Sequence, residues 1–286
     1  MTSPNLCEKA LLVKLTSHKP TLFKRQEAQT EQLQQLSEDK AAAAYVKLFK
    51  FRTPVHDALA KHRDVVRLHH RLTLPYEDRG PRLLPNAQYL TYTQAMREAM
   101  DTVSQWFDQH RLHYPTYVGA DCAARGWKVQ PNEYPTIEQF EAALSHDIEF
   151  LPMPQLSHFL FDLSSEDRAT FAARQEAVAA TAAADALDRV RKPLDSLLAR
   201  LQTYTGQPGQ RFHGSLLTNI TDGLDDCERL LLQDLPPHVA DQFHALRVAV
   251  STLTTNLDLL RDNSTARDTV AALVTTTLTT LQETSL

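Results

Sequence analysis

Glycine is scarce in this chain, with 7 residues among 286. Because glycine supplies the left-handed backbone positions of tight turns, its shortage disfavours turn-rich all-β folds. The sequence also lacks the glycine-rich phosphate loops of ATPases and dinucleotide enzymes, and the HExxH pattern of zinc proteases. We therefore expect no cofactor and no catalytic residues of a standard type. The sequence leans away from an enzyme without excluding one that has an unfamiliar site.

Cysteines are few and long apolar runs are absent. Cys7, Cys122 and Cys227 lie far apart and form no CxxC pair, which disfavours a disulfide framework and favours a reducing compartment. The sequence has no apolar run of about 18 residues, so we expect no transmembrane helix. The first residues also lack the basic and apolar segments of a secretion signal. These features predict a cytoplasmic protein that does not use a membrane.

The histidines and cysteines do not form a recognised metal-binding pattern. His110 and His113 are three residues apart and Cys122 follows, but no fourth ligand occurs at a recognised spacing. Cys122 also has no sequence motif that pairs it with a base. We predict no metal site, and we interpret the histidines as surface or half-buried groups and Cys122 as a buried structural thiol.

Charge is distributed unevenly along the chain, whose net charge is −5. Residues 1–75 contain 13 Lys and Arg against 7 Asp and Glu, an excess of 6 positive charges, so the remaining residues carry −11. A basic segment attached to an acidic body suits nucleic acid or an acidic protein surface. The alternative is internal, with the basic segment packing against the acidic one.

Helical patterns dominate both halves of the sequence. In the first half they predict helices over residues 26–51, 54–72, 86–113 and 136–149, and a short helix within 116–131. In the second half they predict an alanine-rich helix over 165–192, which Pro193 kinks or restarts before Leu201, and then helices over about 211–233, 237–261 and 265–283. Residues 10–15 and 158–163 are the two expected strands.

These patterns predict a mainly α, elongated protein with at most a small two-stranded sheet. We expect an N-terminal α-rich domain over residues 1–160 and a C-terminal helical hairpin or bundle over 164–286. The apolar residues of the last helices recur at threes and fours, and one set keeps a near-heptad spacing typical of a bundle or coiled coil. That set is Val239, Phe243, Leu246, Val250, Leu253, Leu257 and Leu260.

The helix over residues 54–72 carries the densest basic surface that the sequence predicts. We expect Val55, Leu59, Val66 and Leu72 to face inward, while Arg63, Arg67 and Arg71 follow one another at four-residue steps and form a ridge. The candidate nucleic-acid surface comprises Lys47, Lys50, Arg52, Lys61, Arg63, Arg67 and Arg71, with rings supplied by Phe49, Phe51 and Tyr76. The alternative is an ordinary solvated helix face.

The segment over residues 74–89 is rich in proline and polar groups, and its first part is expected to be an ordered loop. Its candidate partner-binding residues are Tyr76, Asp78, Arg79, Arg82, Asn86 and Tyr89. The alternative is a packed corner between two helices, in which Arg82 pairs with Asp78. For the helix that follows, we expect an apolar face that includes Leu90, Met96, Val103, Trp106 and Phe107.

The same loop opens a longer succession of motifs. It reads Leu74-Pro75-Tyr76-x-Asp78-x-Gly80-x-Arg82-Leu83-Leu84-Pro85-x-x-x-Tyr89, then Tyr134-Pro135, then Leu151-Pro152-x-Pro154, then an alanine-rich helix and Phe212-His213-x-Ser215-Leu216-x-x-Asn219. This succession resembles a group of uncharacterised helical proteins encoded by tailed bacteriophages, over about residues 40–260. The group leads us to expect Trp where this chain has Tyr76. The resemblance implies a phage protein made in the host bacterial cytoplasm, and it carries over no catalytic residues.

The sequence therefore favours a non-enzymatic phage accessory protein that binds a phage or host protein. Self-assembly through the C-terminal helices is a further expectation. The alternative is a nucleic-acid-binding protein of phage replication or host takeover, which uses the basic helix region over residues 47–71. A third interpretation is an enzyme with an unfamiliar site near Asp78, Arg82, His110 and His113.

Overall fold

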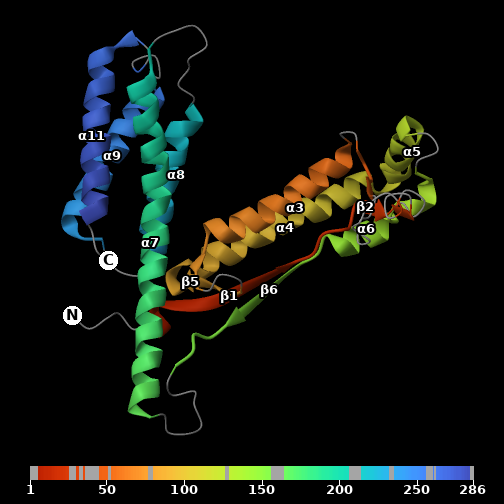
Figure 1. Ribbon diagram of the computed structural model, residues 1–286, viewed down its shortest axis with the longest axis horizontal. Helices are drawn as coiled ribbons and strands as arrows, with labels where there is room; N and C mark the ends of the chain where they lie inside the picture. Colours follow the sequence, from red (N-terminus) through yellow and green to blue (C-terminus); the bar gives the residue numbers. More distant parts are fainter. Residues whose placement is uncertain are drawn as a thin grey trace. The chain divides into compact units, whose positions relative to one another are not determined.

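A computed structural model of the chain describes residues 6–25, 30–31, 35, 45–50, 53–76, 80–125, 129–155, 164–205, 214–231, 235–255, 260 and 262–283. The mainly α fold class is confirmed (Figure 1). The helices are α1 (Leu6–Lys9), α3 (Pro54–Arg71), α4 (Tyr89–His110), α5 (Tyr114–Arg125), α6 (Ile137–Ala143), α7 (Ser165–Thr203), α8 (Gly214–Leu230), α9 (Pro237–Thr255) and α11 (Ser264–Glu283). The strands are β1 (Ala10–Ser17), β2 (Phe23–Arg25), β3 (Tyr45–Lys47), β4 (Leu74–Pro75), β5 (Arg82–Pro85) and β6 (His146–Leu151).

The chain divides into two compact units that interleave in sequence. Unit 1 comprises Met1–Lys14, His70–Leu90 and Phe150–Leu286, and unit 2 comprises Leu15–His69 and Thr91–Glu149. The chain passes from one unit to the other within β1, α3, α4 and β6. This division differs from the one expected at residues 160–164, because early segments pack with the C-terminal helices.

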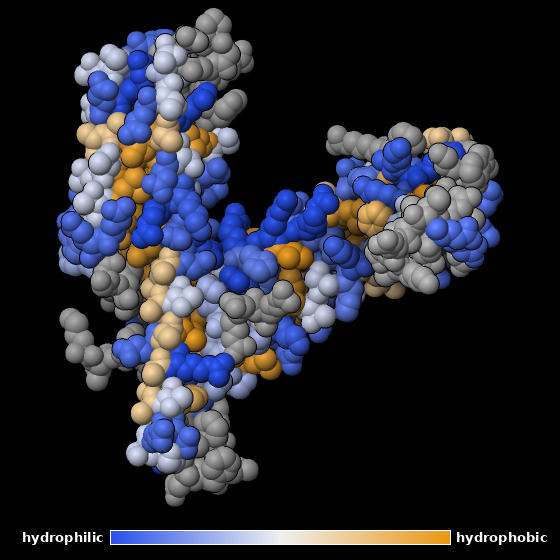
Figure 2. Space-filling model, viewed as in Figure 1, coloured by the Kyte–Doolittle hydropathy of each residue, from blue (hydrophilic) through white to orange (hydrophobic). Residues whose placement is uncertain are grey.

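A bundle of α7, α8, α9 and α11 forms most of unit 1. Each helix packs against the next, and α11 returns to pack against α7 (Figure 1). The near-heptad residues of α9, together with Leu260, lie in the bundle core: Val239, Phe243, Leu246, Val250, Leu253 and Leu260 are all buried. On the bundle, Figure 2 shows a strip of apolar surface within a largely hydrophilic exterior. The apolar seam is thus used inside the molecule.

Helix α7 is much longer than its partners in the bundle. Its 39 residues span about 58 Å, whereas α8, α9 and α11 have 17 to 20 residues and span about 26–30 Å. It begins after Ser164, whose hydroxyl accepts a 3.0 Å hydrogen bond from the backbone N–H of Asp167. Pro193 does not restart it, since the helix runs on to Thr203. Its buried residues begin at Ala182, so the first half carries little of the core.

The main sheet has four strands in the order β4-β5-β1-β6, which is larger than the two-stranded sheet expected. The strand expected at residues 10–15 is confirmed as β1, and its partner 158–163 lies outside the described residues. β1 instead pairs antiparallel with β5, with Leu12 opposite Leu83. In the segment expected to be a loop, residues 74–75 and 82–85 form the strands β4 and β5, which pair with Leu74 opposite Leu83.

Two expected helix ends are wrong. The helix expected over 136–149 begins as expected, with the Thr136 side chain accepting from the backbone N–H of Gln139. It ends at Ala143, and β6 follows, because residues 146–149 alternate between half-buried and exposed in the pattern of a strand. The helix expected over 26–51 is also wrong at its end, where residues 45–47 form β3 and pair with β2. Most of 26–44 lies outside the described residues.

Unit 2 is built around an aromatic core. Phe49 is fully buried, with a positive φ of 48°, and its ring centroid lies 4.9 Å from that of Tyr134. Trp106 and Phe107 of α4 pack on Phe140 of α6. The expected apolar face of α4 holds at its C-terminal end, but Leu90 is 77% exposed.

The buried face of α3 differs from the one expected. Val55 is buried, but the other core positions are Ala58, His62, Val65 and His69, while Leu59 and Val66 are half-buried. Two of the histidines expected to be surface or half-buried groups therefore lie in the core. Each has a partner there: His69 Nδ1 lies 2.8 Å from the Tyr92 hydroxyl, and His62 Nε2 lies 3.2 Å from the Ser17 hydroxyl. Hydrogen bonds to side chains from distant segments offset the cost of burying these two polar rings.

Candidate interaction surfaces

The basic ridge of α3 is exposed in part. Arg63 and Arg67 are exposed, and Arg67 Nη1 lies 3.0 Å from Asp64 Oδ1 on the same helix. Both side chains of this pair are more than 60% exposed, so it contributes at most about 1 kcal/mol. Arg71 is exposed as well, and its positive charge acts on the buried Asp226. Arg63 and Arg67 are thus the ridge residues with the most open surroundings.

Among the other described candidate cations, Lys47 and Lys50 do not lie on α3 with the ridge, and Lys61 does. Lys61 is half-buried on α3, Lys47 lies in β3, and Lys50 follows β3. Arg52 lies outside the described residues. The basic helix region expected over residues 47–71 is helical only from Pro54 onward, because Lys47 ends the strand β3. Binding of nucleic acid by these residues stays a prediction.

The candidate loop residues are held mainly by contacts within unit 1. The Arg82 guanidinium donates to the Thr73 hydroxyl at 2.7 Å and to its carbonyl at 3.3 Å, and burial lowers the pKa of Arg82. The Asn86 amide donates to the Glu8 carbonyl at 2.9 Å, and Tyr76 packs against the bundle core. These contacts favour the packed-corner alternative, with Thr73 as the partner of Arg82. Asp78 and Arg79 lie outside the described residues.

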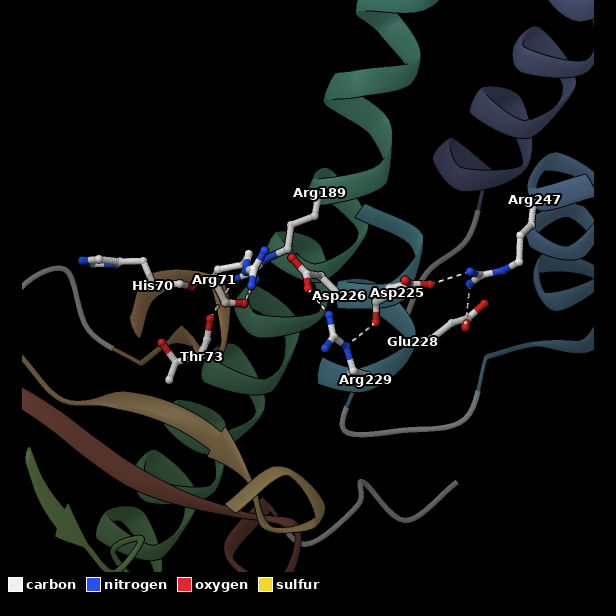
Figure 3. Close-up of polar contacts among 9 residues, drawn as sticks. All are labelled: His70, Arg71, Thr73, Arg189, Asp225, Asp226, Glu228, Arg229 and Arg247. Atoms are coloured by element: carbon white, nitrogen blue, oxygen red, sulfur yellow. Dashed lines mark hydrogen bonds and ion pairs between the residues drawn. The ribbon is translucent and has the colours of Figure 1, made fainter. Parts of the chain in front are cut away.

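Arg189 of α7 is an organising residue that the sequence did not reveal. Its guanidinium donates to the backbone carbonyls of His70, Arg71 and Thr73, with 2.7 Å to the Thr73 oxygen (Figure 3). It also donates to the Asp185 carboxylate at 2.9 Å. His70 and Arg71 are the last residues of α3, where carbonyls lack helical partners. The sequence shows that Arg189 follows Asp185 by four residues, but it does not show which backbone carbonyls Arg189 binds.

A chain of ion pairs continues from this point across α8 and α9 (Figure 3). Arg229 contacts the buried Asp226 at 2.5 Å, and Arg247 of α9 binds Asp225 and Glu228 of α8, with 3.0 Å to Glu228. Burial raises the pKa of Asp226, and the neighbouring arginines oppose that rise. Because each charge has an opposite partner, this cluster serves to join helices rather than to bind a ligand.

Two histidines form a buried cluster in unit 2. The His62 and His146 rings lie 4.5 Å apart, and neither His62 Nδ1 nor His146 Nε2 has a hydrogen-bond partner. Burial, followed by the charges of His146, Lys19 and Arg63, lowers the pKa of His62 to about 4. Burial also lowers the pKa of His146. Both rings are therefore neutral at pH 7.

The residues that the sequence suggested as metal ligands do not belong to the His62 and His146 cluster. His110 Nδ1 lies 2.7 Å from the Tyr117 hydroxyl, and its ring stacks on Trp106 at 4.7 Å. Cys122, expected to be buried, is half-buried, whereas Cys227 is fully buried and its pKa is raised by burial to about 12. Among the described residues, no three His, Cys, Asp or Glu side chains converge as metal ligands would.

Exposed apolar side chains gather at two places. In unit 1, the Tyr89 ring at the start of α4 lies against Phe150 of β6, and Leu90 follows Tyr89 in sequence; Tyr89, Phe150 and Leu90 are 40%, 37% and 77% exposed. The Tyr89 and Phe150 rings are 5.0 Å apart, and we call these three residues the Tyr89 patch. In unit 2, Phe23 and Tyr45 on the β2–β3 ribbon are 56% and 61% exposed. Tyr89 was among the candidate partner residues, whereas the other four side chains were not.

No family model, curated protein or solved structure matches this chain. The resemblance to phage proteins therefore stays a prediction. Within the described part of the chain, no helix is both long and apolar enough to cross a membrane.

Proposed function

We propose that this chain acts by binding a partner protein through the Tyr89 patch. The observation that carries the proposal is the contact between two exposed rings, Tyr89 and Phe150, from segments that lie about 60 residues apart in sequence, with the exposed Leu90 next to Tyr89 in the chain. Aromatic and large apolar side chains are typical anchors at the centre of protein interfaces. A contiguous exposed apolar patch is a sign of such an interface, whereas single exposed side chains are not.

The proposed occupant is a segment of another protein that presents apolar side chains of its own. Three side chains cover much less than the roughly 800 Å² per partner that a stable dimer buries, so the patch suits a short docking segment better than a second copy. The α9 seam gives no separate support to self-assembly, because its described residues pack inside the bundle. The phage setting and the host cytoplasm in this proposal come from the sequence resemblance alone.

The test places a photo-crosslinking amino acid at position 90 and, as a matched control, at position 112. Leu112 is 89% exposed but does not belong to the patch. Crosslinks from position 112 therefore measure chance contacts. We expect a discrete protein adduct from position 90 and none of that mass from position 112. The same adduct from both positions, or none from position 90, contradicts the proposal.

The captured protein is then purified and titrated against variants by calorimetry. Tyr89→Ser with Leu90→Ser is expected to weaken binding at least tenfold, because apolar anchors are removed from the interface. Leu112→Ser is expected to bind like the unmodified chain. Equal affinity of the double variant and the unmodified chain contradicts the proposal.

A further inference from the structure

The β2–β3 ribbon of unit 2 presents rings and a cation on one face. In its antiparallel register Phe23 lies opposite Lys47, and Tyr45 lies two residues before Lys47. Directly opposed residues share a face of a sheet, as do residues two apart on one strand. Phe23, Tyr45 and Lys47 therefore share a face, and all three side chains are exposed.

The ribbon is fixed at its base, so the exposure of its rings is a feature of an anchored structure. The backbone N–H of Leu48 donates to the Leu22 carbonyl at 2.8 Å, which extends the ladder beyond the two strands. Leu22, Leu48 and Phe49 are all buried, and Phe49 packs on Tyr134. Residues 22 and 48 enter the core while residues 23 and 47 stay outside, so the ribbon holds Phe23 and Lys47 on the surface.

The two strands of the ribbon and the residues beside them are basic, whereas residues 26–44, which join the strands in sequence, carry one Lys and four Asp or Glu. Residues 18–25 and 45–52 contain six Lys or Arg and no Asp or Glu. Lys19, Lys47 and Lys50 are exposed among the described ones. A partner for this surface must offer flat groups that stack on rings and negative charges that meet the lysines. Bases joined by phosphates supply both, whereas an apolar protein segment supplies no compensating charge.

We propose that the β2–β3 ribbon binds single-stranded nucleic acid. Bases stack on Phe23 and Tyr45, and Lys47 contacts a phosphate beside them. Stacking tolerates every base, so the site binds without strong sequence preference. A duplex hides its base faces and is bound more weakly. This site uses other residues than the Tyr89 patch and does not rest on protein docking there.

The test measures fluorescence anisotropy of labelled 20-residue oligomers, dT and rU, and of a 20-base-pair duplex, at two salt concentrations. We expect both single strands to bind more tightly than the duplex, and the DNA and RNA arms show which strand is preferred. Phe23→Ala with Tyr45→Ala is expected to weaken single-strand binding at least tenfold, because base stacking on two rings is lost. Lys47→Gln is expected to lower the salt dependence by about 0.7 in the log–log slope, as one phosphate contact is lost.

Two further variants show where the strand binds. Leu112→Ser removes an exposed apolar side chain of unit 2 that is not on the ribbon, and it is expected to bind like the unmodified chain. Phe23→Trp keeps a stacking surface, and its added fluorescence is expected to be quenched on binding. Unchanged far-UV circular dichroism of the Phe23→Ala, Tyr45→Ala variant shows that the fold is retained.

Three results overturn the proposal. The first is affinity that survives removal of both rings but disappears with Arg63→Glu and Arg67→Glu, which moves the site to the α3 ridge. The second is equal binding of polyglutamate and the single strands, which makes the surface a general anion or acidic-protein site. The third is the absence of single-strand binding at low salt.

Discussion

Arg189 stabilises unit 1 mainly through backbone carbonyls. Its side chain is 17% exposed and donates to three carbonyl oxygens as well as to Asp185. Carbonyls at a helix end need partners, and a guanidinium carries enough N–H groups to meet several at once. The residue thus joins α7 to the last turn of α3 and to Thr73, which precedes β4.

We predict that Arg189→Gln lowers the free energy of unfolding by about 2–4 kcal/mol, because carbonyls lose their donor and Asp185 loses its charge partner. Lys192→Gln on the same helix is the control. Lys192 is 76% exposed and lies 3.4 Å from Asp188, so its loss is expected to cost less than about 0.5 kcal/mol. Urea unfolding followed by far-UV circular dichroism measures both, and equal losses would contradict the assigned role.

The candidate residues show which exposed and buried side chains could be predicted from the sequence. The exposure of Arg63 and Arg67 follows from their charge, and it was predicted. The burial of His62 and His69 was not predicted, because it depends on hydroxyl partners far away in the chain: Ser17 for His62 and Tyr92 for His69. A histidine has no fixed preference for surface or core, so its hydrogen-bond partners decide whether it is buried.

At the scale of elements, one close approach sets the packing of α7 on α8. A Cβ atom added at Gly223 would lie 2.3 Å from the Arg189 carbonyl oxygen and 3.1 Å from its carbonyl carbon. Both atoms belong to the backbone, so a rotamer change cannot relieve the contact. Glycine at this position lets the two helices meet at the level of the Arg189 cluster.

We predict that Gly223→Ala destabilises the bundle by about 3 kcal/mol, because the helices must move apart. Gly119→Ala is the matched control. Gly119 also lies in a helix, and an added Cβ would meet nothing within 4 Å. That change is expected to stabilise the chain by about 0.5–1 kcal/mol through helix propensity. Thermal and urea unfolding of the two variants should move in opposite directions, and a neutral Gly223→Ala would refute the close approach.

Elements with local signals were predicted well. Helix α3 begins at Pro54 and α7 begins at Ser165, at the first residues of the ranges that the sequence predicted. Strand β6 was taken for helix, because residues 146–151 follow a capped helix without an intervening Gly or Pro. Strands β4 and β5 were predicted to be loop, because proline is rare in strands. Here Pro75 lies in a strand of two residues and Pro85 lies at the end of a strand.

At the scale of the whole molecule, the interleaved units can be followed separately. Both tryptophans, Trp106 and Trp127, occur in the sequence of unit 2, so tryptophan fluorescence reports on that unit. Trp106 is 3% exposed. The His62 and His146 cluster belongs to the same unit, and its charge state therefore has a direct optical readout.

We predict that unit 2 loses stability as the pH falls from about 6.5 to about 4. The pKa of His62 is about 4 when folded and near 6.5 when unfolded, so the unfolded chain binds the proton first. The stabilisation is complete above pH 6.5 and is lost progressively on acidification, by up to about 3 kcal/mol. Facing groups act in the same direction, since His146, Lys19 and Arg63 all disfavour a charged His62.

Urea unfolding followed by tryptophan fluorescence at pH 7 and pH 5 measures this loss. His62→Gln removes the titrating ring, and it is expected to reduce the difference between the two pH values. His18→Gln changes the exposed histidine that directly follows β1, and it serves as the control. A His62→Gln variant that keeps the full difference would show that other groups carry the acid sensitivity.

The sequence by itself determined the helical class, the starts of α3 and α7, and the α9 residues that fill the bundle. Helices depend on hydrogen bonds between residues four apart and on a short apolar period, so a local window holds this information. The tertiary structure alone decided that β1 pairs with β5, that Arg189 binds the end of α3, and that Phe23 and Tyr45 share an exposed face with Lys47. Each of these depends on residues brought together from distant segments, and the periodicity of one segment does not reveal its partner.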